Sequence, residues 1–476
     1  MSEAVVVGSG PNGLAAAITL ARAGREVTLY EAADTVGGGT RSAEVTVPGA
    51  LSDVCSAVHP FGAASPFFNR LPLARHGLEW IHPEAPLAHP LPDRPAALLE
   101  RSLDATADGL GPDGGRYRAL VSPVVQRWDA LVGDLLAPLV RAPRAPLALA
   151  TFGVRSLWPA TTLARTVFRD EPGRALFAGL ACHAVLPLEQ PLTAAFGVMF
   201  AAVGHVAGWP VAKGGSQAIA DALAGHLEEL GGKIETGQPI TSLAEVADSE
   251  LVLLDVTPRQ FLLLAVERLP PRFRRSLARF RYGTAVYKVD YALDGPIPWA
   301  DERCTRAATV HVGGTMAELS VSEAEAFAGR HAERPFLIVA QQSLFDPSRV
   351  PGAVQVAWAY AHVPHGSTVD MSGRIDAQIE RFAPGFRDRI LARHDTAPAD
   401  LERYNANYIG GDISGGSADG LQYIFRPRPT LMPYATPLEG VYLCSSSTPP
   451  GGGVHGMCGY HAARAALHGS RRRRRR

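Results

Sequence analysis

Three glycines near the N-terminus have the spacing of a phosphate-binding loop. Gly8, Gly10 and Gly13 form the pattern G-x-G-x-x-G. The first glycine permits a tight turn, the second lets a pyrophosphate approach the backbone, and the third lets a helix pack closely on a sheet. The N–H groups at the start of that helix attract phosphate, and so does the helix dipole. The sequence therefore predicts a dinucleotide site at Gly8, Ser9, Gly10, Pro11, Asn12 and Gly13.

An acidic residue completes this motif. Glu31 lies eighteen residues after Gly13, where a carboxylate accepts hydrogen bonds from an adenosine ribose. We expect Glu31 and the adjacent Ala32 to contact the cofactor. Neither Lys nor Arg directly follows Glu31, so a 2′-phosphate would face a carboxylate. This arrangement argues against NADP at the site.

A second glycine cluster follows in the segment Gly38, Gly39, Thr40 and Arg41. It comes just after the second predicted strand, at the sheet edge where the first loop also emerges. We expect this loop to pass close to the cofactor, with Arg41 within reach of a phosphate. The alternative interpretation is a plain glycine turn.

The C-terminal region repeats the strand–glycine loop–helix pattern. Gly451–Gly453 precede a helix predicted to begin at Val454, His455, Gly456 and Met457 and to end near Leu467. The free N–H groups of its first turn would face a partial negative charge. In a flavoenzyme that charge develops at the N1/C2=O edge of the reduced ring. A helix end stabilises such a charge by about 0.3–1 kcal/mol when exposed and by up to about 2 kcal/mol when partly buried.

The elements that must position these loops can be predicted from hydrophobic patterning. Short apolar runs predict buried strands, and Ile219, Leu223, Leu227 and Leu230 predict an amphipathic helix over 216–230. These segments return the chain to an α/β pattern and should rejoin the first sheet. The strands are expected at Ala4–Val7, Val27–Tyr30, Lys233–Thr236, Ile240–Leu243, Leu251–Asp255 and Gly440–Cys444.

The remaining segments predict a second domain. The region 117–206 is mostly helical by pattern, and Thr193–Ala212 carries no formal charge over twenty residues. Because this stretch is rich in Ala and Gly, contains His205 and is interrupted by Pro210, a buried helix lining an apolar cavity is favoured over a membrane span. Strands are expected at Val286–Leu293, Phe336–Gln341 and Ala353–His362, and a helix at Ile375–Phe382.

Composition excludes several classes of protein. The 476 residues are 46% hydrophobic and 19% charged, which is enough for two packed domains. Net charge is zero, but the terminal Arg471–Arg476 supply six positive charges, so the body is near −6, which argues against nucleic acid as a partner. Five scattered cysteines without C-x-x-C make a disulfide framework and a zinc site improbable.

The termini also bear on location. No export signal is visible at the N-terminus, and a cytoplasmic location is expected. The basic tail 471–476 is expected to be solvated and disordered, with peripheral membrane contact as the alternative.

Several motifs together resemble the phytoene-dehydrogenase-related FAD oxidoreductases, a group that includes carotenoid desaturases, carotenoid isomerases and retinol saturase. The likeness spans nearly the whole chain. Its end motifs, GSGPNG and STPPGGGVHGMCGYHAA at 447–463, are the specific ones. The middle motifs are weaker: GWP…KGGS at 208–216, LFDPSR at 344–349 and YIGGDISGG at 408–416.

The resemblance implies an α/β, two-domain FAD-dependent oxidoreductase. A Rossmann-like FAD domain would consist of segments 1–75, 206–268 and 406–470. A mixed-sheet plus helical substrate domain would consist of 76–205 and 269–405. It also implies a flavin that faces a long apolar tunnel. By the same likeness, Ile240 would contact the adenine through its backbone, Thr257 would lie near the pyrophosphate loop, and Ser446 and Gly453 would line the flavin site.

The function implied is hydride transfer between flavin N5 and a carbon of an apolar, isoprenoid or lipid-like substrate. With one complete dinucleotide fingerprint, the electron acceptor is expected to be oxygen, a quinone or a protein. No metal is expected. His59 and His455 are the nearest polar candidates beside the ring. The first alternative is a flavin amine oxidase, with Trp358 and Tyr360 as its aromatic pair, and the second is a flavin-binding interaction protein without turnover.

Overall fold

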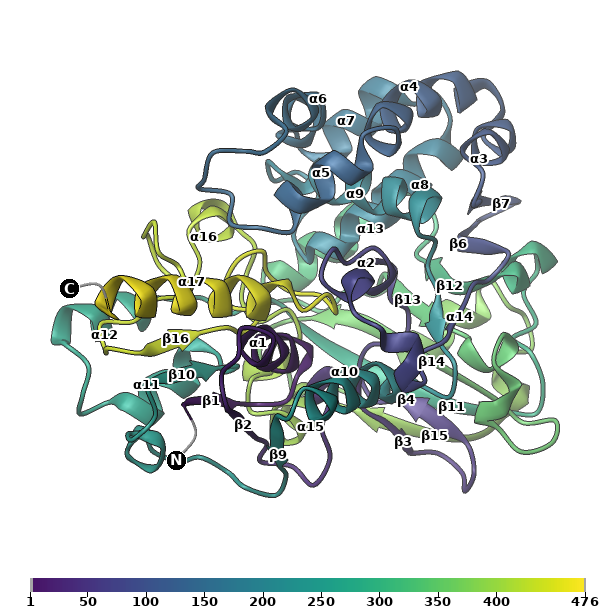
Figure 1. Ribbon diagram of the computed structural model, residues 1–476. Coiled ribbons are helices and arrows are strands. Elements are labelled where there is room, and N and C mark those ends of the chain that lie inside the picture. The colour runs from purple at the N-terminus through teal and green to yellow at the C-terminus, as the bar shows by residue number, and fades with distance from the viewer. Residues whose placement is uncertain (1–2, 475–476) are drawn as a thin grey trace.

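The computed structural model describes residues 3–474 (Figure 1). Its first sheet has five parallel strands in the order β16-β10-β1-β2-β9. Four of them are largely apolar, buried runs, as expected where helices cover both faces of a parallel sheet, while the edge strand at 233–235 is Lys-Ile-Glu and largely exposed. The strands are β1 (Ala4–Val7), β2 (Val27–Tyr30), β9 (Lys233–Glu235), β10 (Leu251–Leu254) and β16 (Val441–Leu443). They come from the three segments predicted to form the FAD domain, whose exact boundaries stay a prediction.

One predicted strand of this sheet is wrong. Residues 240–242 are irregular, and Leu243–Val246 form a 3-10 turn. The Ser242 hydroxyl accepts a hydrogen bond from the Ala244 N–H, while Glu245 Oε1 accepts one from the Ser242 N–H at 2.7 Å. This reciprocal capping begins a helical turn, which overrides the strand preference of the short apolar run.

Three helices cover one face of the first sheet. They are α1 (Pro11–Ala21), α10 (Gln217–Glu229) and α17 (Met457–Arg474), and α1 lies between the other two (Figure 1). A side chain at Gly459 would come within 1.7 Å of the Asn12 carbonyl oxygen, so α1 and α17 pack backbone against backbone. The opposite face carries α11 (Pro258–Ala265) and α12 (Pro271–Leu277).

Helix α17 differs from its prediction at both ends. It begins at Met457 rather than Val454, because the His455 Nδ1 atom accepts the Met457 N–H at 3.0 Å and caps the first turn. It continues past Leu467 to Arg474, so four residues of the tail expected to be disordered are helical. The last two residues of that tail lie outside the described range.

The second sheet has seven strands in the order β15-β11-β14-β13-β12-β6-β7, and all neighbours are antiparallel except β12 and β6. Strand β14 alternates as predicted. Its small residues pack in the core with α14 (Ser372–Glu380), while Trp358 and Tyr360 point to the other face. The strands are β6 (Ala85–Leu91), β7 (Arg94–Leu99), β11 (Ala285–Leu293), β12 (Ala307–Val312), β13 (Leu337–Ala340), β14 (Gln355–Val363) and β15 (Ile390–Thr396).

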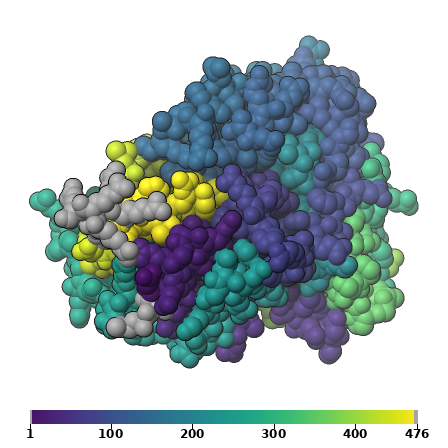
Figure 2. All heavy atoms as spheres, viewed as in Figure 1, coloured from purple at the N-terminus to yellow at the C-terminus, as the bar shows by residue number. Residues whose placement is uncertain are grey.

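A layer of helices lies over that second face, at the top of Figure 1. In Figure 2 this layer (blue) rests against the C-terminal helix (yellow), and His461 of α17 indeed contacts the Leu136 carbonyl at 3.1 Å. The layer consists of α3 (Leu103–Gly109), α4 (Gly114–Val125), α5 (Trp128–Leu135), α6 (Pro146–Ser156), α7 (Ala160–Val167), α8 (Glu171–Ala181) and α9 (Thr193–Val206).

Helix α9 confirms the interpretation of the uncharged stretch. It has 14 residues, and its Phe196, Met199 and Phe200 line a cavity. Within the described range, every helix is too short or too polar to cross a bilayer.

Short elements complete the fold. Strands β3 (Ser42–Glu44) and β4 (Leu51–Asp53) pair with each other, as do β5 (Trp80–Ile81) and β8 (Val211–Ala212). The remaining helices are α2 (Pro60–Ala63), α13 (Met316–Phe327), α15 (Pro398–Tyr404) and α16 (Gly420–Ile424).

Candidate active site

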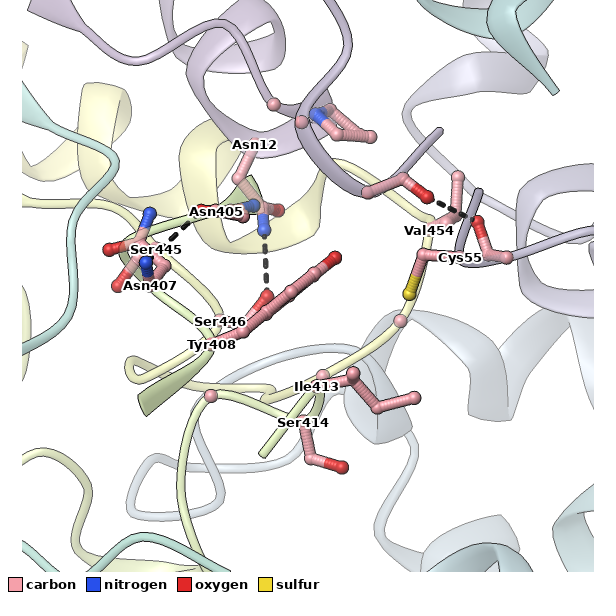
Figure 3. Close-up of a pocket in the computed structure, with 18 of the residues that line it drawn as sticks. Asn12, Cys55, Asn405, Asn407, Tyr408, Ile413, Ser414, Ser445, Ser446 and Val454 are labelled. Atoms are coloured by element: carbon pink, nitrogen blue, oxygen red, sulfur yellow. Dashed lines mark hydrogen bonds between the residues drawn. The ribbon is translucent and has the colours of Figure 1, made fainter. Parts of the chain in front are cut away.

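One cavity of about 960 Å³ joins the carboxyl ends of the first sheet to the space between the second sheet and α9. Gly8 and Gly10 of the N-terminal loop line it, and so do Gly452 and Gly453 of the C-terminal loop. Asn12 and Ser446 hydrogen-bond across it at 3.3 Å (Figure 3). The two strand-to-helix corners therefore meet over the same space, as the sequence predicts.

Most of the predicted site residues line this cavity. Gly13, Gly456 and Met457 do not, and each has a structural role instead. A side chain at Gly13 would meet the Gly8 carbonyl at 1.9 Å, so Gly13 lets α1 pack against β1. Gly456 has a φ of 68° and leaves no room for a side chain beside Phe68. The residues that do line it are Gly8, Ser9, Gly10, Pro11, Asn12, Glu31, Ala32, Gly38, Gly39, Thr40, Arg41, His59, Ile240, Thr257, Ser446, Gly453, Val454 and His455.

The first loop is arranged to accept an anion. Within the described range, the backbone N–H groups of Gly10 and Asn12 have no hydrogen-bond acceptor, and both residues line the cavity. They stand at the start of α1, where the helix dipole favours negative charge. These donors fit a pyrophosphate.

Glu31 is held in place by hydrogen bonds and an ion pair. Its Oε2 atom accepts the Ser9 N–H at 2.8 Å, and its Oε1 atom accepts the Ala33 N–H at 2.9 Å. The Arg41 guanidinium lies 3.1 Å from Oε1 and also donates to the Thr35 carbonyl. Arg41 is thus held by Glu31 and the loop backbone. Because Glu31 also binds the Ser9 N–H, Arg41 connects the glycine loop at 38–41 to the first loop at 8–13.

Asp255, at the end of β10, was not predicted as a site residue. Its Oδ2 atom accepts the Gly13 N–H at 2.9 Å, and a side chain at Gly10 would come within 2.7 Å of the same oxygen. Burial raises the pKa of Asp255 to about 7, although the Gly13 N–H opposes the shift. The available signal was an acid at the end of a predicted strand next to β1.

The segment 404–408 was also missed (Figure 3). Asn407 accepts the Thr257 N–H at 2.8 Å and donates to the Asp255 carbonyl at 3.0 Å. Tyr404 donates its hydroxyl hydrogen to the Gly38 carbonyl at 2.7 Å. This segment therefore fixes both the second glycine loop and the end of β10.

His59 and His455 line the cavity, but one ring nitrogen of each is already engaged in a hydrogen bond within the protein. Ser216 donates its hydroxyl hydrogen to the Ser56 carbonyl at 2.7 Å, so its 2.8 Å contact with His59 Nε2 requires an N–H on that nitrogen. His455 Nδ1 accepts the Met457 N–H. Burial lowers the pKa of each histidine to about 4. Both rings are neutral at pH 7, so neither is a strong proton donor.

A buried ion network explains two of the weaker motifs. Arg349 contacts Asp53 at 2.6 Å and Asp346 at 3.0 Å, and it donates to the Ala212 carbonyl at 2.7 Å. Asp53 in turn accepts the Ser216 N–H at 2.7 Å. The segments 208–216 and 344–349 thus meet through this network, which holds the partner of His59 in place.

The other half of the cavity is mainly apolar. Trp358 and Tyr360 stack with ring centroids 5.4 Å apart, and both line the cavity rather than the core behind β14. Within the described lining, the carboxylates are Glu31 and Asp255, both at the phosphate-loop end. The apolar lining includes Phe61, Phe196, Met199, Phe200, Trp209, Ile338 and Ala340.

Away from the cavity, His76, His226 and Glu229 have ligand atoms within 4.8 Å of one another. Both imidazoles contact Glu229 Oε2 at 3.0 Å, and Arg75 contacts the other carboxylate oxygen at 2.9 Å. Hydrogen bonds account for this group without a metal ion.

Comparisons with known proteins agree with this architecture. Residues 6–71 match the NAD(P)-binding Rossmann-like domain. A rat pyridine nucleotide-disulfide oxidoreductase domain-containing protein 2 is 26% identical over 97% of this chain and 92% of its own. A hydroxyneurosporene desaturase of Cereibacter sphaeroides is 30% identical over 51% of this chain and 50% of its own. Putrescine oxidase bound to putrescine superposes with a TM-score of 0.60 over 98% of each chain, at 16% identity.

These findings agree on the fold. The chain has a two-domain α/β fold with a Rossmann-like dinucleotide-binding domain.

Proposed function

We propose that the protein is an FAD-dependent oxidoreductase that moves a hydride between an apolar substrate carbon and flavin N5. The observation that carries this proposal is the cavity, whose anion-binding loop and apolar half are continuous. The phytoene-dehydrogenase-like motifs and the partial similarity to a desaturase support an apolar, isoprenoid or lipid-like substrate.

The residues present fit FAD. The free N–H groups of Gly10 and Asn12 would hold the pyrophosphate, Glu31 the adenosine ribose, Ile240 the adenine, and Gly453 the flavin. When bound, FAD would supply the two-electron redox chemistry, so the chain itself needs little acid–base machinery.

The chain's own residues would orient the substrate and exclude water. Phe200, Trp358 and Tyr360 form apolar and aromatic walls, and the helical layer closes the cavity from above. His59 is held neutral against Ser216, so it would present an uncharged surface to the reacting carbon. We propose oxygen, a quinone or a protein as the electron acceptor. A cytoplasmic location, peripheral membrane contact and the lack of a nucleic-acid partner also stay predictions.

The test is flavin retention and reduction. The purified protein should be yellow and should bleach anaerobically when its substrate is added. Gly10→Val should abolish flavin retention, because the new side chain would meet Asp255 Oδ2 and block the pyrophosphate. Gly115→Val, at an exposed position with open space around it, is the matched control. Full flavin retention by Gly10→Val would remove the phosphate-loop assignment.

Amine oxidation is the second candidate, because an aromatic pair lines the cavity and putrescine oxidase shares the fold. Release of hydrogen peroxide from simple amines would favour it. The described lining of the substrate half offers no carboxylate to bind an ammonium group, so we place it second.

A further inference from the structure

The substrate half of the cavity has one polar end. His183 in the turn after α8, and Tyr360 and His362 on β14, line it together. His183 stacks on Phe200, with ring centroids 4.2 Å apart, and it remains partly exposed. These side chains therefore place hydrogen-bonding groups within otherwise apolar walls.

The hydrogen-bond partners of His183 and its neighbour His311 determine which ring nitrogen of each carries the proton. Their Nε2 atoms are 3.0 Å apart, so one must donate and the other accept. His311 Nδ1 is enclosed and has no partner within the described range. A proton there would be a buried N–H without an acceptor, which is rare and costly. The His311 proton therefore belongs on Nε2, where His183 accepts it.

It follows that His183 carries its own proton on Nδ1. That atom is neither enclosed nor hydrogen-bonded within the described range, and its residue lines the cavity. Burial lowers the pKa of His183 to about 3, so the ring is neutral and holds a single proton. His89 follows the same pattern, since its Nε2–H donates to the Gly314 carbonyl at 2.7 Å and its enclosed Nδ1 has no partner.

The neighbouring groups at this end are a second imidazole and a hydroxyl, which can donate or accept. His362 Nδ1 lies 2.9 Å from both oxygens of Glu323, which accept its N–H from behind the cavity wall. The Tyr360 hydroxyl has no partner within the described range. Glu323 itself does not line the cavity.

We infer that the substrate carries a carbonyl or carboxylate oxygen at one end of an otherwise apolar body, and that His183 Nδ1–H binds this oxygen. An ammonium group has only donors to offer and could not accept the His183 N–H. A pure hydrocarbon would leave the His183 N–H without an acceptor. This inference rests on the proposed function, because it assumes that the ligand of this cavity is the substrate.

The test compares four ten-carbon probes of similar shape: 2-decanone, decanoate, decane and decylamine. Binding is followed by tryptophan fluorescence, because Trp209 and Trp358 line the cavity. We expect 2-decanone or decanoate to bind at least about tenfold more tightly than decane and decylamine, as one buried hydrogen bond allows. Equal affinities, or a preference for decylamine, would overturn the inference.

The His183→Phe variant removes the donor and keeps a ring against Phe200. It should lower the affinity for the preferred oxygenated probe about tenfold and leave decane binding unchanged. The control is His205→Phe, since His205 contacts Tyr117 at 2.7 Å and does not line the cavity. If His183→Phe does not fold, the ranking of the four probes on the unaltered protein decides.

Failure of the proposed function has a different signature. The fluorescence assay needs no redox step, so a head-group preference without flavin retention would contradict the proposed function alone. Flavin reduction by an unfunctionalised hydrocarbon, with no head-group preference, would contradict this inference alone.

Discussion

Replacing Arg349 with methionine should destabilise the protein strongly, because it would leave two buried carboxylates without their ion pair. Arg349 and Asp346 are each 1% exposed, and Asp53 is fully buried. Removing one partner of a buried pair costs about 3–5 kcal/mol. Asp53 keeps the Ser216 N–H, and Asp346 keeps the Gly214 N–H at 2.7 Å, so we expect about 3 kcal/mol, at the lower end.

That loss can be measured by thermal unfolding. The unfolding entropy of 476 residues is about 1 kcal/mol/K, so Arg349→Met should lower Tm by about 3 °C if the chain unfolds as one unit. The double variant Arg349→Met/Asp53→Asn should recover part of the loss, since an amide needs no counter-charge. Arg330→Met, which breaks an exposed pair with Glu325, is the control and should not change Tm measurably. Equal Tm values for Arg349→Met and Arg330→Met would refute the reasoning.

The loss of stability in Arg349→Met should also depend on pH. Burial raises the pKa of Asp346, but hydrogen bonds from Ser348, Gly214 and Arg349 outweigh it and hold the pKa below the usual value. An acid with a lowered folded-state pKa stabilises the fold above its unfolded pKa and loses that contribution as the pH falls through the folded value. Arg349→Met removes part of this contribution, so the difference in Tm between the variant and the original protein should shrink below about pH 4.

Three further predictions concern the loop end of the cavity. Gly13→Val should prevent folding, because its side chain would lie 1.9 Å from the Gly8 carbonyl oxygen; soluble, cooperatively unfolding protein would contradict this. Asp255→Asn should flatten the pH dependence of stability in flavin-free protein. The folded pKa of about 7 lies above the unfolded value, so stability should fall as the pH rises from about 4 to 7 in the original protein but not in the variant. Tyr404→Phe removes one hydrogen bond to Gly38 and should cost about 1 kcal/mol in chemical denaturation, with weaker flavin retention.

The fold was largely predictable because its signals are local. Four of the five parallel strands are short, largely apolar runs, and the first and last glycine loops each lie between a strand and a helix. The strand predicted at Ile240–Leu243 is wrong because the Ser242–Glu245 capping pair, which is also a local signal, stabilises a helical turn there. The C-terminal helix began late because His455 caps it, and a histidine cap has no clear sequence signature.

The site was predictable only where residues adjacent in sequence act together. Gly10 and Glu31 belong to one compact motif. Asp255, Asn407 and Arg349 act through partners far away in sequence: Arg349 pairs with Asp53, 296 positions away. Such contacts depend on how the two sheets are placed, and hydrophobic periodicity carries no information on that placement.

The distribution of charge along the cavity separates the two candidate chemistries. The loop end holds both lining carboxylates, Glu31 tied to Arg41 and Asp255 bound by the Gly13 N–H, so neither is free to bind a cationic substrate. Amine oxidation needs a neutral amine near the flavin and a site that tolerates its charged form during entry. Hydride transfer from carbon needs neither.

If decylamine neither binds nor reduces the flavin between pH 7 and pH 10, where its neutral fraction rises, amine oxidation is excluded for this cavity. Flavin reduction that grows with pH over the same range would reverse the order of the two proposals.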